Sequence, residues 1–154
     1  MSKPKPAPLP PGTVVGGYQI VKKLAAGGFG VVYLAEDPDK RLVALKEYLP
    51  ASLAERSADE LIPRVKPDKQ PLYRLGLKSF FEEGRSLAQI AHPSVVSVYN
   101  FFRENETVHM VMNYLQGDTL QDFIVTDREH KRDKVFRHST ISSLFDYILR
   151  GLRI

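Results

Sequence analysis

Three features of this 154-residue sequence could act together on a negatively charged ligand. Gly27, Gly28 and Gly30 form a run in which main-chain N–H groups can approach a ligand with no Cβ in the way. Lys46 offers a cation from an apolar stretch, and Glu83 offers a carboxylate from a stretch with helical periodicity. Backbone donors, one cation and a carboxylate that holds the cation together suit a polyphosphate.

The glycine run must be positioned by strands. It lies at a reversal between two β-rich stretches, 18–24 and 31–35, and such a reversal is either a plain hairpin or a lid over phosphates. A dinucleotide-binding fold needs its glycines to open a helix, whereas the residues after Gly30 have the character of a strand. No Gly-Lys-Ser/Thr follows a glycine run, which excludes a Walker P-loop.

Lys46 and Glu83 must be brought together by a strand and a helix. A strand is predicted at 41–47, after a turn at 37–40, and its period of two places Lys46 on a face with apolar neighbours. A buried ammonium is costly without a negative partner, so we predict a pair with Glu83, the alternative being that each side chain reaches water separately. Glu83 borders the inward face of a helix predicted at 71–91. That face consists of Leu77, Phe80, Gly84, Leu87 and Ala91.

The rest of the chain is predicted to be less regular between these elements and β-rich after them. Residues 48–70 are expected to form mostly loop, with a short helix at 51–56. Two more strands are predicted at 95–102 and 107–113, joined by a polar turn at 103–106.

Residues 117–154 have helical character. A short helix is predicted to about residue 125, and a second one begins at Ser139 or Thr140. The second helix carries six large apolar residues, with almost no chain left to cover them. If these side chains stay exposed, the chain loses on the order of 10 kcal/mol of hydrophobic stabilisation, at about 1.5–3 kcal/mol per side chain. We therefore expect this sequence to be a fragment or a truncated gene product.

The glycine, lysine and glutamate motifs resemble those of the protein kinase family. The family's G-x-G-x-x-G-x-V pattern is met by Gly27, Gly30 and Val32, with Ala25 in place of the first glycine. The sequence VALK, which ends at Lys46, is similar to the V-A-I-K strand motif. By the same resemblance, Glu83 is the helix glutamate that orients this lysine, and the catalytic set is Lys46 and Glu83.

Residues 110–120, with the sequence MVMNYLQGDTL, are similar to the fifth strand and hinge of the family. The resemblance implies that Met112 is the gatekeeper, that the backbones of Asn113 and Leu115 bond the adenine edge, and that Asp118 reaches the ribose. Leu24, Val32 and Ala44 would enclose the base. The implied nucleotide-binding set is Leu24, Ala25, Ala26, Gly27, Gly28, Phe29, Gly30, Val31, Val32, Ala44, Lys46, Met112, Asn113, Leu115 and Asp118.

The resemblance implies an α+β fold. A kinase-like small lobe with a five-stranded antiparallel sheet and one αC-type helix would be followed by two helices of an incomplete large lobe. We expect a Pro-rich disordered leader at 1–15, an ATP-binding lobe at 16–116 and the start of the large lobe at 117–154. The family's H-R-D-x-x-x-x-N and D-F-G motifs are absent. His130-Lys131-Arg132-Asp133 precedes the last helix, and Asp122-Phe123-Ile124 lacks the glycine.

The expected function follows from the same resemblance. Lys-Glu-Tyr-Leu-Pro after the lysine strand looks most like bacterial serine/threonine kinases of the eukaryotic-like type. Such a kinase transfers the γ-phosphoryl group of ATP, with Mg²⁺, to protein hydroxyls. Here the metal ligands would lie outside the chain, which alone is predicted to be inactive and to need the rest of the large lobe. The alternative is a catalytically dead nucleotide-binding or interaction module, like a pseudokinase remnant.

The composition bears on the cellular location and on the class of binding partner. The chain has no cysteine, no apolar run near the roughly 18 residues that span a bilayer, and no signal-peptide core, which fits a cytoplasmic protein without a membrane segment. Its net charge is +4, but the basic residues are scattered apart from 128–134. A nucleic-acid module using that stretch would bind with steep salt dependence; we expect a solvated surface and no nucleic acid partner.

Overall fold

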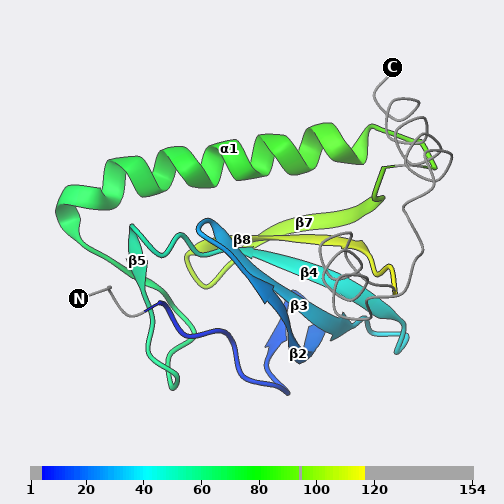
Figure 1. Cartoon of the computed structure of the whole chain (residues 1–154), viewed down its shortest axis with the longest axis horizontal. Helices are drawn as coiled ribbons and strands as arrows, with labels where there is room; N and C mark the ends of the chain where they lie inside the picture. Colours follow the sequence, from blue (N-terminus) through cyan, green and yellow to red (C-terminus); the bar gives the residue numbers. More distant parts are fainter. Residues whose placement is uncertain (1–4, 94, 117–154) are drawn as a thin grey trace, which may run out of the picture. The chain divides into compact units, whose positions relative to one another are not determined.

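The structure is a computed structural model that describes residues 5–93 and 95–116. The described residues before 92, together with 96–114, form one compact unit. This unit is an antiparallel sheet with one long helix, α1 (Gln70–Ala88), lying along it (Figure 1). The predicted helices beyond residue 117, the start of the large lobe and Asp118 lie outside the described residues.

The main sheet has six strands in the order β1-β2-β3-β4-β8-β7, one more than the sequence predicts. The extra strand, β1, has two residues and pairs with the start of β2. The long strands agree with the predicted ones to within three residues at either end. The six strands are β1 (Val14–Val15), β2 (Tyr18–Ala26), β3 (Gly30–Glu36), β4 (Leu42–Tyr48), β7 (Val98–Glu104) and β8 (Thr107–Asn113).

Helix α1 follows a short 3-10 turn, η1 (Pro67–Lys69), and contacts β7 and β8. Its buried residues are spaced three and four apart and include Leu77, Phe80 and Gly84 of the predicted inward face. Leu87 is half-buried against the core, which also agrees with the prediction. Ala91 does not belong to this face, because the helix ends at Ala88 and Ala91 is exposed.

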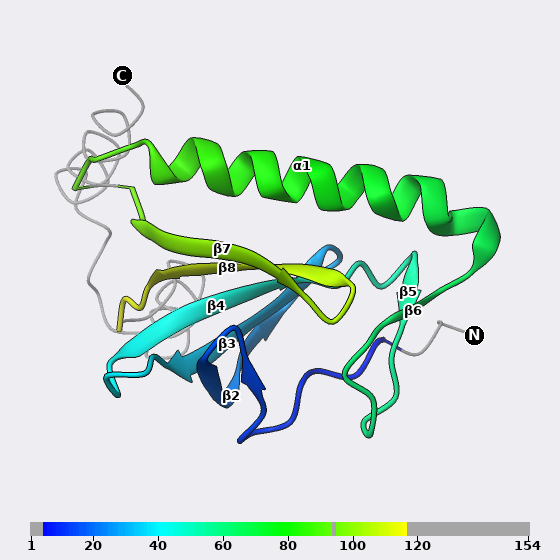
Figure 2. The same cartoon turned by 180° about the vertical axis from the view of Figure 1, so that it is seen from behind.

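The segment between β4 and α1 differs from the prediction. No helix forms at 51–56; instead β5 (Ala54–Glu55) pairs with β6 (Arg64–Val65) in a small second sheet (Figure 2). Burial alternates along the chain here, with Ala54 and Arg56 inside and Glu55 exposed. Alternation of this kind is the period of a strand, so tertiary burial overrides the helical propensity of the stretch.

The N-terminal segment is not a disordered leader over its described part, residues 5–15. Leu9 is only 2% exposed and belongs to the core, as does Val15. The N–H of Leu9 donates to the Tyr33 hydroxyl, and the N–H of Ala7 donates to the carbonyl of Arg56, both at 2.9 Å. The expectation was wrong because composition averages over the stretch. One buried leucine can fix a proline-rich segment whose prolines leave few N–H groups to satisfy.

The hairpin between β7 and β8 turns more tightly than the predicted polar turn. Glu104 pairs with Thr107, so only Asn105 and Glu106 lie in the loop. Their φ angles are 53° and 56°. Two successive residues with positive φ are typical of a type I′ turn, whose twist matches that of the flanking strands.

Candidate functional site

The predicted pair between β4 and α1 is present. Lys46 Nζ lies 3.7 Å from Glu83 Oε1 and 5.2 Å from the centroid of the Phe80 ring. The Lys46 side chain is 32% exposed and that of Glu83 is 53% exposed. Because water reaches both partners, the pair contributes no more than about 1 kcal/mol to stability. It leaves the ammonium charged and within reach of a ligand.

The sheet face around Lys46 offers small and apolar side chains. In the β3–β4 register Val32 lies opposite Lys46, and in the β4–β8 register Met112 lies opposite Ala44. Cross-strand partners share a face, so these four predicted residues lie together. Val31 pairs with Glu47 and is buried in the core, so its side chain lies on the other face. Leu24, on β2, is partly exposed.

The glycine loop between β2 and β3 presents bare main chain. A Cβ added at Gly27 or Gly28 would meet no atom within 4 Å, so both have open space above them. Ala25 and Ala26 are exposed at the end of β2, and Phe29 is 78% exposed. The loop therefore presents backbone and one aromatic side chain to the surroundings.

The same loop is anchored on its inner side by the chain that follows β4. The carbonyls of Phe29 and Gly28 accept hydrogen bonds from the N–H groups of Leu49 and Ala51, at 3.0 and 3.2 Å. A Cβ at Gly30 would lie 2.1 Å from the Glu47 carbonyl oxygen, a separation that real Cβ atoms do not reach. Only glycine therefore allows the backbone at the start of β3 to approach the Glu47 carbonyl this closely.

The end of β8 holds the residues predicted to contact an adenine edge. The N–H of Asn113 donates to the Ser97 carbonyl at 2.9 Å, so this N–H is not available to a ligand. Leu115, which lies outside the compact unit that contains Asn113, is exposed.

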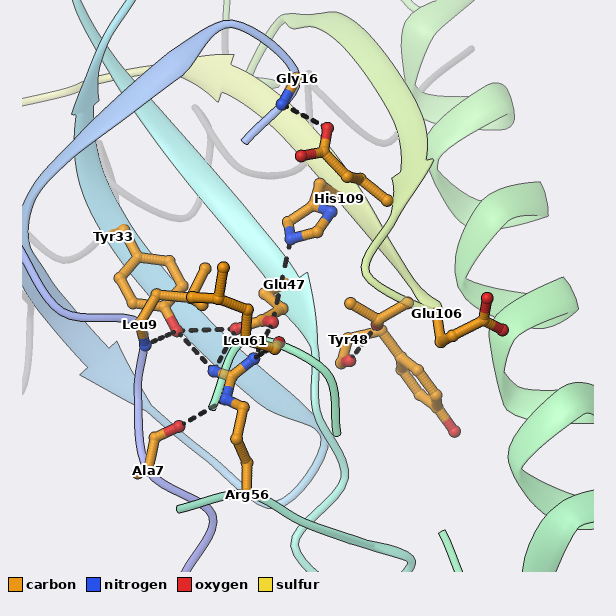
Figure 3. Close-up of polar contacts among 12 residues, drawn as sticks. Ala7, Leu9, Gly16, Tyr33, Glu47, Tyr48, Arg56, Leu61, Glu106 and His109 are labelled. Atoms are coloured by element: carbon orange, nitrogen blue, oxygen red, sulfur yellow. Dashed lines mark hydrogen bonds and ion pairs between the residues drawn. The ribbon is translucent and has the colours of Figure 1, made fainter. Parts of the chain in front are cut away.

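A buried polar cluster on the opposite face of β4 was missed by the sequence analysis (Figure 3). Arg56 Nη1 and Nη2 donate to the two carboxylate oxygens of Glu47 at 2.5 and 2.9 Å, and both side chains are fully buried. The Tyr33 hydroxyl donates to Glu47 at 2.7 Å. One signal was visible: Glu47 follows Lys46 in an apolar strand, so the period of two points it into the opposite face.

Burial controls the charge state of the other members of this cluster. Desolvation, then the Glu47 carboxylate, raises the pKa of Tyr33 above its ordinary value, which keeps the hydroxyl a donor at neutral pH. Desolvation lowers the pKa of His109, although Glu47 and Glu104 oppose this effect and Arg56 adds to it. Neither ring nitrogen of His109 has a hydrogen-bond partner among the described residues, and the ring stacks on Phe102.

We expect acid to destabilise the fold through His109. Because its pKa is lowered in the folded state from 6.5, the unfolded chain takes up the proton first as the pH falls. The free energy of unfolding should therefore decrease from pH 7.5 to pH 5.5, by at most about 1.4 kcal/mol, because pH 5.5 lies only one unit below the unfolded-state pKa. Denaturant titrations at both pH values test this. His109→Phe should reduce the decrease; equal decreases in wild type and His109→Phe would contradict the prediction.

A cavity of about 630 Å³ is lined by residues of α1 and of the β7–β8 hairpin. Tyr73, Leu77 and Phe81 of the helix line it, with Arg103 and Val108 from the β7–β8 hairpin. None of Lys46, Ala44 or Met112 lines it, so it is separate from the glycine-loop face.

No cluster of three or more His, Cys, Asp or Glu side chains that could hold a metal ion lies in residues 5–93 and 95–116. None of the helices in this part of the chain combines the length and apolar character needed for a membrane crossing.

Comparison with known proteins gives consistent matches. The profile described as Protein kinase domain matches residues 18–154. A serine/threonine-protein kinase of Caenorhabditis elegans is 33% identical over 151 residues, which are 90% of this chain and 13% of the relative. The serine/threonine-protein kinase PrkC of Bacillus subtilis is 32% identical over 115 residues, 74% of this chain and 15% of the relative.

The folds agree as well. The solved structure described as the PpkA-294 apo form superimposes with a TM-score of 0.74 at 35% identity, over 80% of this chain and 44% of that one. The chain therefore spans less than half of each of these matched proteins. The sheet with one helix agrees with the predicted kinase-like small lobe.

Proposed function

Since the chain belongs to the protein kinase family, we propose that its described part binds ATP as the small lobe of a serine/threonine protein kinase. The observation that carries this proposal is the 3.7 Å pair of Lys46 and Glu83, on the sheet face next to a glycine loop with open main chain. A ligand-accessible lysine beside a glycine loop with open space at Gly27 and Gly28 suits the phosphates of a nucleotide.

The roles of the residues follow from their positions. Lys46 would contact the α- and β-phosphates, Glu83 would orient Lys46, and the loop from Ala25 to Gly30 would cover the phosphates with its N–H groups. Ala44 has a small side chain, which would leave room for a flat base on this face of the sheet.

The remaining contacts to the base would come from residues around Ala44. Val32 and Leu24 would enclose the base from the β2–β3 side. Met112 would act as gatekeeper, the Asn113 carbonyl and the Leu115 backbone would bond the adenine edge, and Asp118 would reach the ribose.

For the whole protein we propose transfer of the ATP γ-phosphoryl group to hydroxyl groups of a protein substrate. The base and the Mg²⁺ ligands would come from outside this chain, so the 154 residues alone should bind nucleotide without transferring phosphate. A cytoplasmic location is part of the proposal.

Nucleotide binding by Lys46→Met tests the proposal. Loss of the cation should raise the Kd for ATP at least about tenfold, because a charge-assisted contact to phosphate is removed. The Kd for adenosine, which lacks phosphates, should change less than about twofold. Isothermal titration calorimetry measures both values.

Lys40→Met is the matched control, because Lys40 is an exposed lysine in a 3.2 Å pair with Glu36. It should leave both affinities unchanged. If wild type binds ATP no better than adenosine, or if Lys46→Met binds ATP like wild type, the proposed site is wrong.

A further inference from the structure

The chain from Glu47 to Arg56 is closed into a loop by a single ion pair. Both guanidinium Nη atoms bind the Glu47 carboxylate, one to each oxygen, in the fork geometry that restricts position most strongly. Both side chains have zero exposure, so solvent does not weaken the pair. We call Glu47 and Arg56 the clasp.

The clasp is held from several directions (Figure 3). Arg56 Nε donates to the Ala7 carbonyl at 2.9 Å, and Arg56 Nη1 also donates to the Leu61 carbonyl at 3.2 Å. Tyr33 donates to the Glu47 carboxylate and accepts from the N–H of Leu9. The N-terminal segment therefore covers the clasp and satisfies part of its hydrogen-bonding capacity.

The loop that the clasp closes carries the anchors of the glycine loop. The N–H groups of Leu49 and Ala51 donate to the carbonyls of Phe29 and Gly28, and the Glu47 carbonyl packs against Gly30. These contacts all lie on the inner side of the glycine loop, where a ligand does not come. The position of the glycine loop relative to the sheet therefore depends on the position of residues 47–51.

The clasp also affects the orientation of Lys46, because Glu47 follows it directly in β4. Successive side chains of a strand point to opposite faces, so a slip by one residue would bury Lys46 and expose Glu47. On its own face Lys46 has the partly exposed contact to Glu83 at 3.7 Å and lies 5.2 Å from the centroid of the Phe80 ring. The clasp on the other face adds a fully buried constraint to the register that the ladders with β3 and β8 set.

We propose that Glu47 and Arg56 are positioning residues for the nucleotide phosphates, because they hold both Lys46 and the glycine loop in place from behind. The inference rests on the proposed binding of ATP. It predicts that the clasp affects the phosphate-dependent part of nucleotide affinity and leaves the binding of the base unchanged.

The test is a variant that removes the clasp and keeps the fold. In Glu47→Leu/Arg56→Met, apolar side chains of similar size replace a buried ion pair, a change that is often neutral for stability. The Kd for ATP should rise about fivefold or more while the Kd for adenosine stays within about twofold, by calorimetry of the full chain. An unchanged ATP affinity in the folded double variant would overturn the proposal.

Two further variants keep the test decisive. Arg56→Lys retains the charge and loses the fork, so it should raise the Kd for ATP by about threefold and decides the question if the double variant does not fold. Arg64→Met is the matched control, since Arg64 lies in the same segment and pairs with Glu60 at 2.8 Å, but is exposed. It should change neither affinity; if it weakens ATP binding as much as Arg56→Lys, the clasp has no special role.

The two proposals fail in different ways. If wild type shows no preference for ATP over adenosine, or Lys46→Met retains it, the proposed nucleotide site is wrong. If Lys46→Met loses the preference and the clasp variants keep it, only the positioning role is wrong. Equal weakening of ATP and adenosine by the clasp variants would indicate a general structural effect and would also overturn the positioning role.

Discussion

Arg56→Ala is expected to lower the free energy of unfolding by about 3–5 kcal/mol, because it leaves the Glu47 carboxylate buried without its counter-charge. The fully buried pair and the Tyr33 hydroxyl form one network, so the remaining single hydrogen bond cannot replace the two from the guanidinium. For a domain near 100 residues this corresponds to a fall in Tm of more than about 10 °C. Thermal and urea denaturation, followed by circular dichroism, measure both quantities.

The controls separate burial from charge. Arg64→Ala removes an exposed arginine that also pairs with a glutamate, and it should cost less than about 1 kcal/mol. Glu47→Leu/Arg56→Met should recover most of the stability lost in Arg56→Ala. If Arg56→Ala is as stable as Arg64→Ala, the buried pair does not form in solution.

Gly30→Ala is expected to lower the free energy of unfolding by about 3 kcal/mol, at the upper end of overpacking effects. The added Cβ would lie 2.1 Å from the Glu47 carbonyl oxygen, and a backbone atom within a sheet cannot move aside as a flexible side chain can. Separation of β3 from β4 is the way to relieve the overlap, so ATP affinity should fall as well. Denaturant unfolding and calorimetry with ATP report the two effects.

Gly28→Ala is the matched control in the same loop. Its Cβ would meet no atom within 4 Å, and its φ is not positive, so the free energy of unfolding should change by less than about 1 kcal/mol. Equal stability of Gly30→Ala and Gly28→Ala would show that β3 does not approach the Glu47 carbonyl as described.

Local patterns in the sequence predicted much of this fold. Alternating side chains defined the strands that became β2, β3, β4 and β8, and the helical period defined α1 with Leu77, Phe80 and Gly84 on its inward face. These periods are set by backbone geometry, so they can be read without knowing what each element packs against. The Lys46–Glu83 pair followed from the same reasoning, since two charges bordering apolar faces need partners.

The errors lie where packing overrides composition. Residues 51–56 have acceptable helical propensity, yet they form β5 and its continuation because Ala54 and Arg56 are drawn inside. Residues 5–15 have the composition of a disordered stretch, yet Leu9 enters the core. Secondary-structure propensity and composition are properties of a local stretch of sequence. Neither includes the burial of that stretch against residues that are distant in the sequence.

The sequence by itself determined the order of strands and helix and the kinase-like motifs, because each depends on local periodicity and on residue types. It predicted the pairing of Lys46 with Glu83 but left open that each side chain reaches water separately, and the structure shows the pair. Only the tertiary structure decided that Arg56 reaches Glu47 across nine positions of the chain, and that Ala7 and Leu9 cover them. Such contacts depend on the path of the loops between the strands, and the local periodicity of the sequence does not specify this path. The buried clasp behind Lys46 could therefore be found only in the folded molecule.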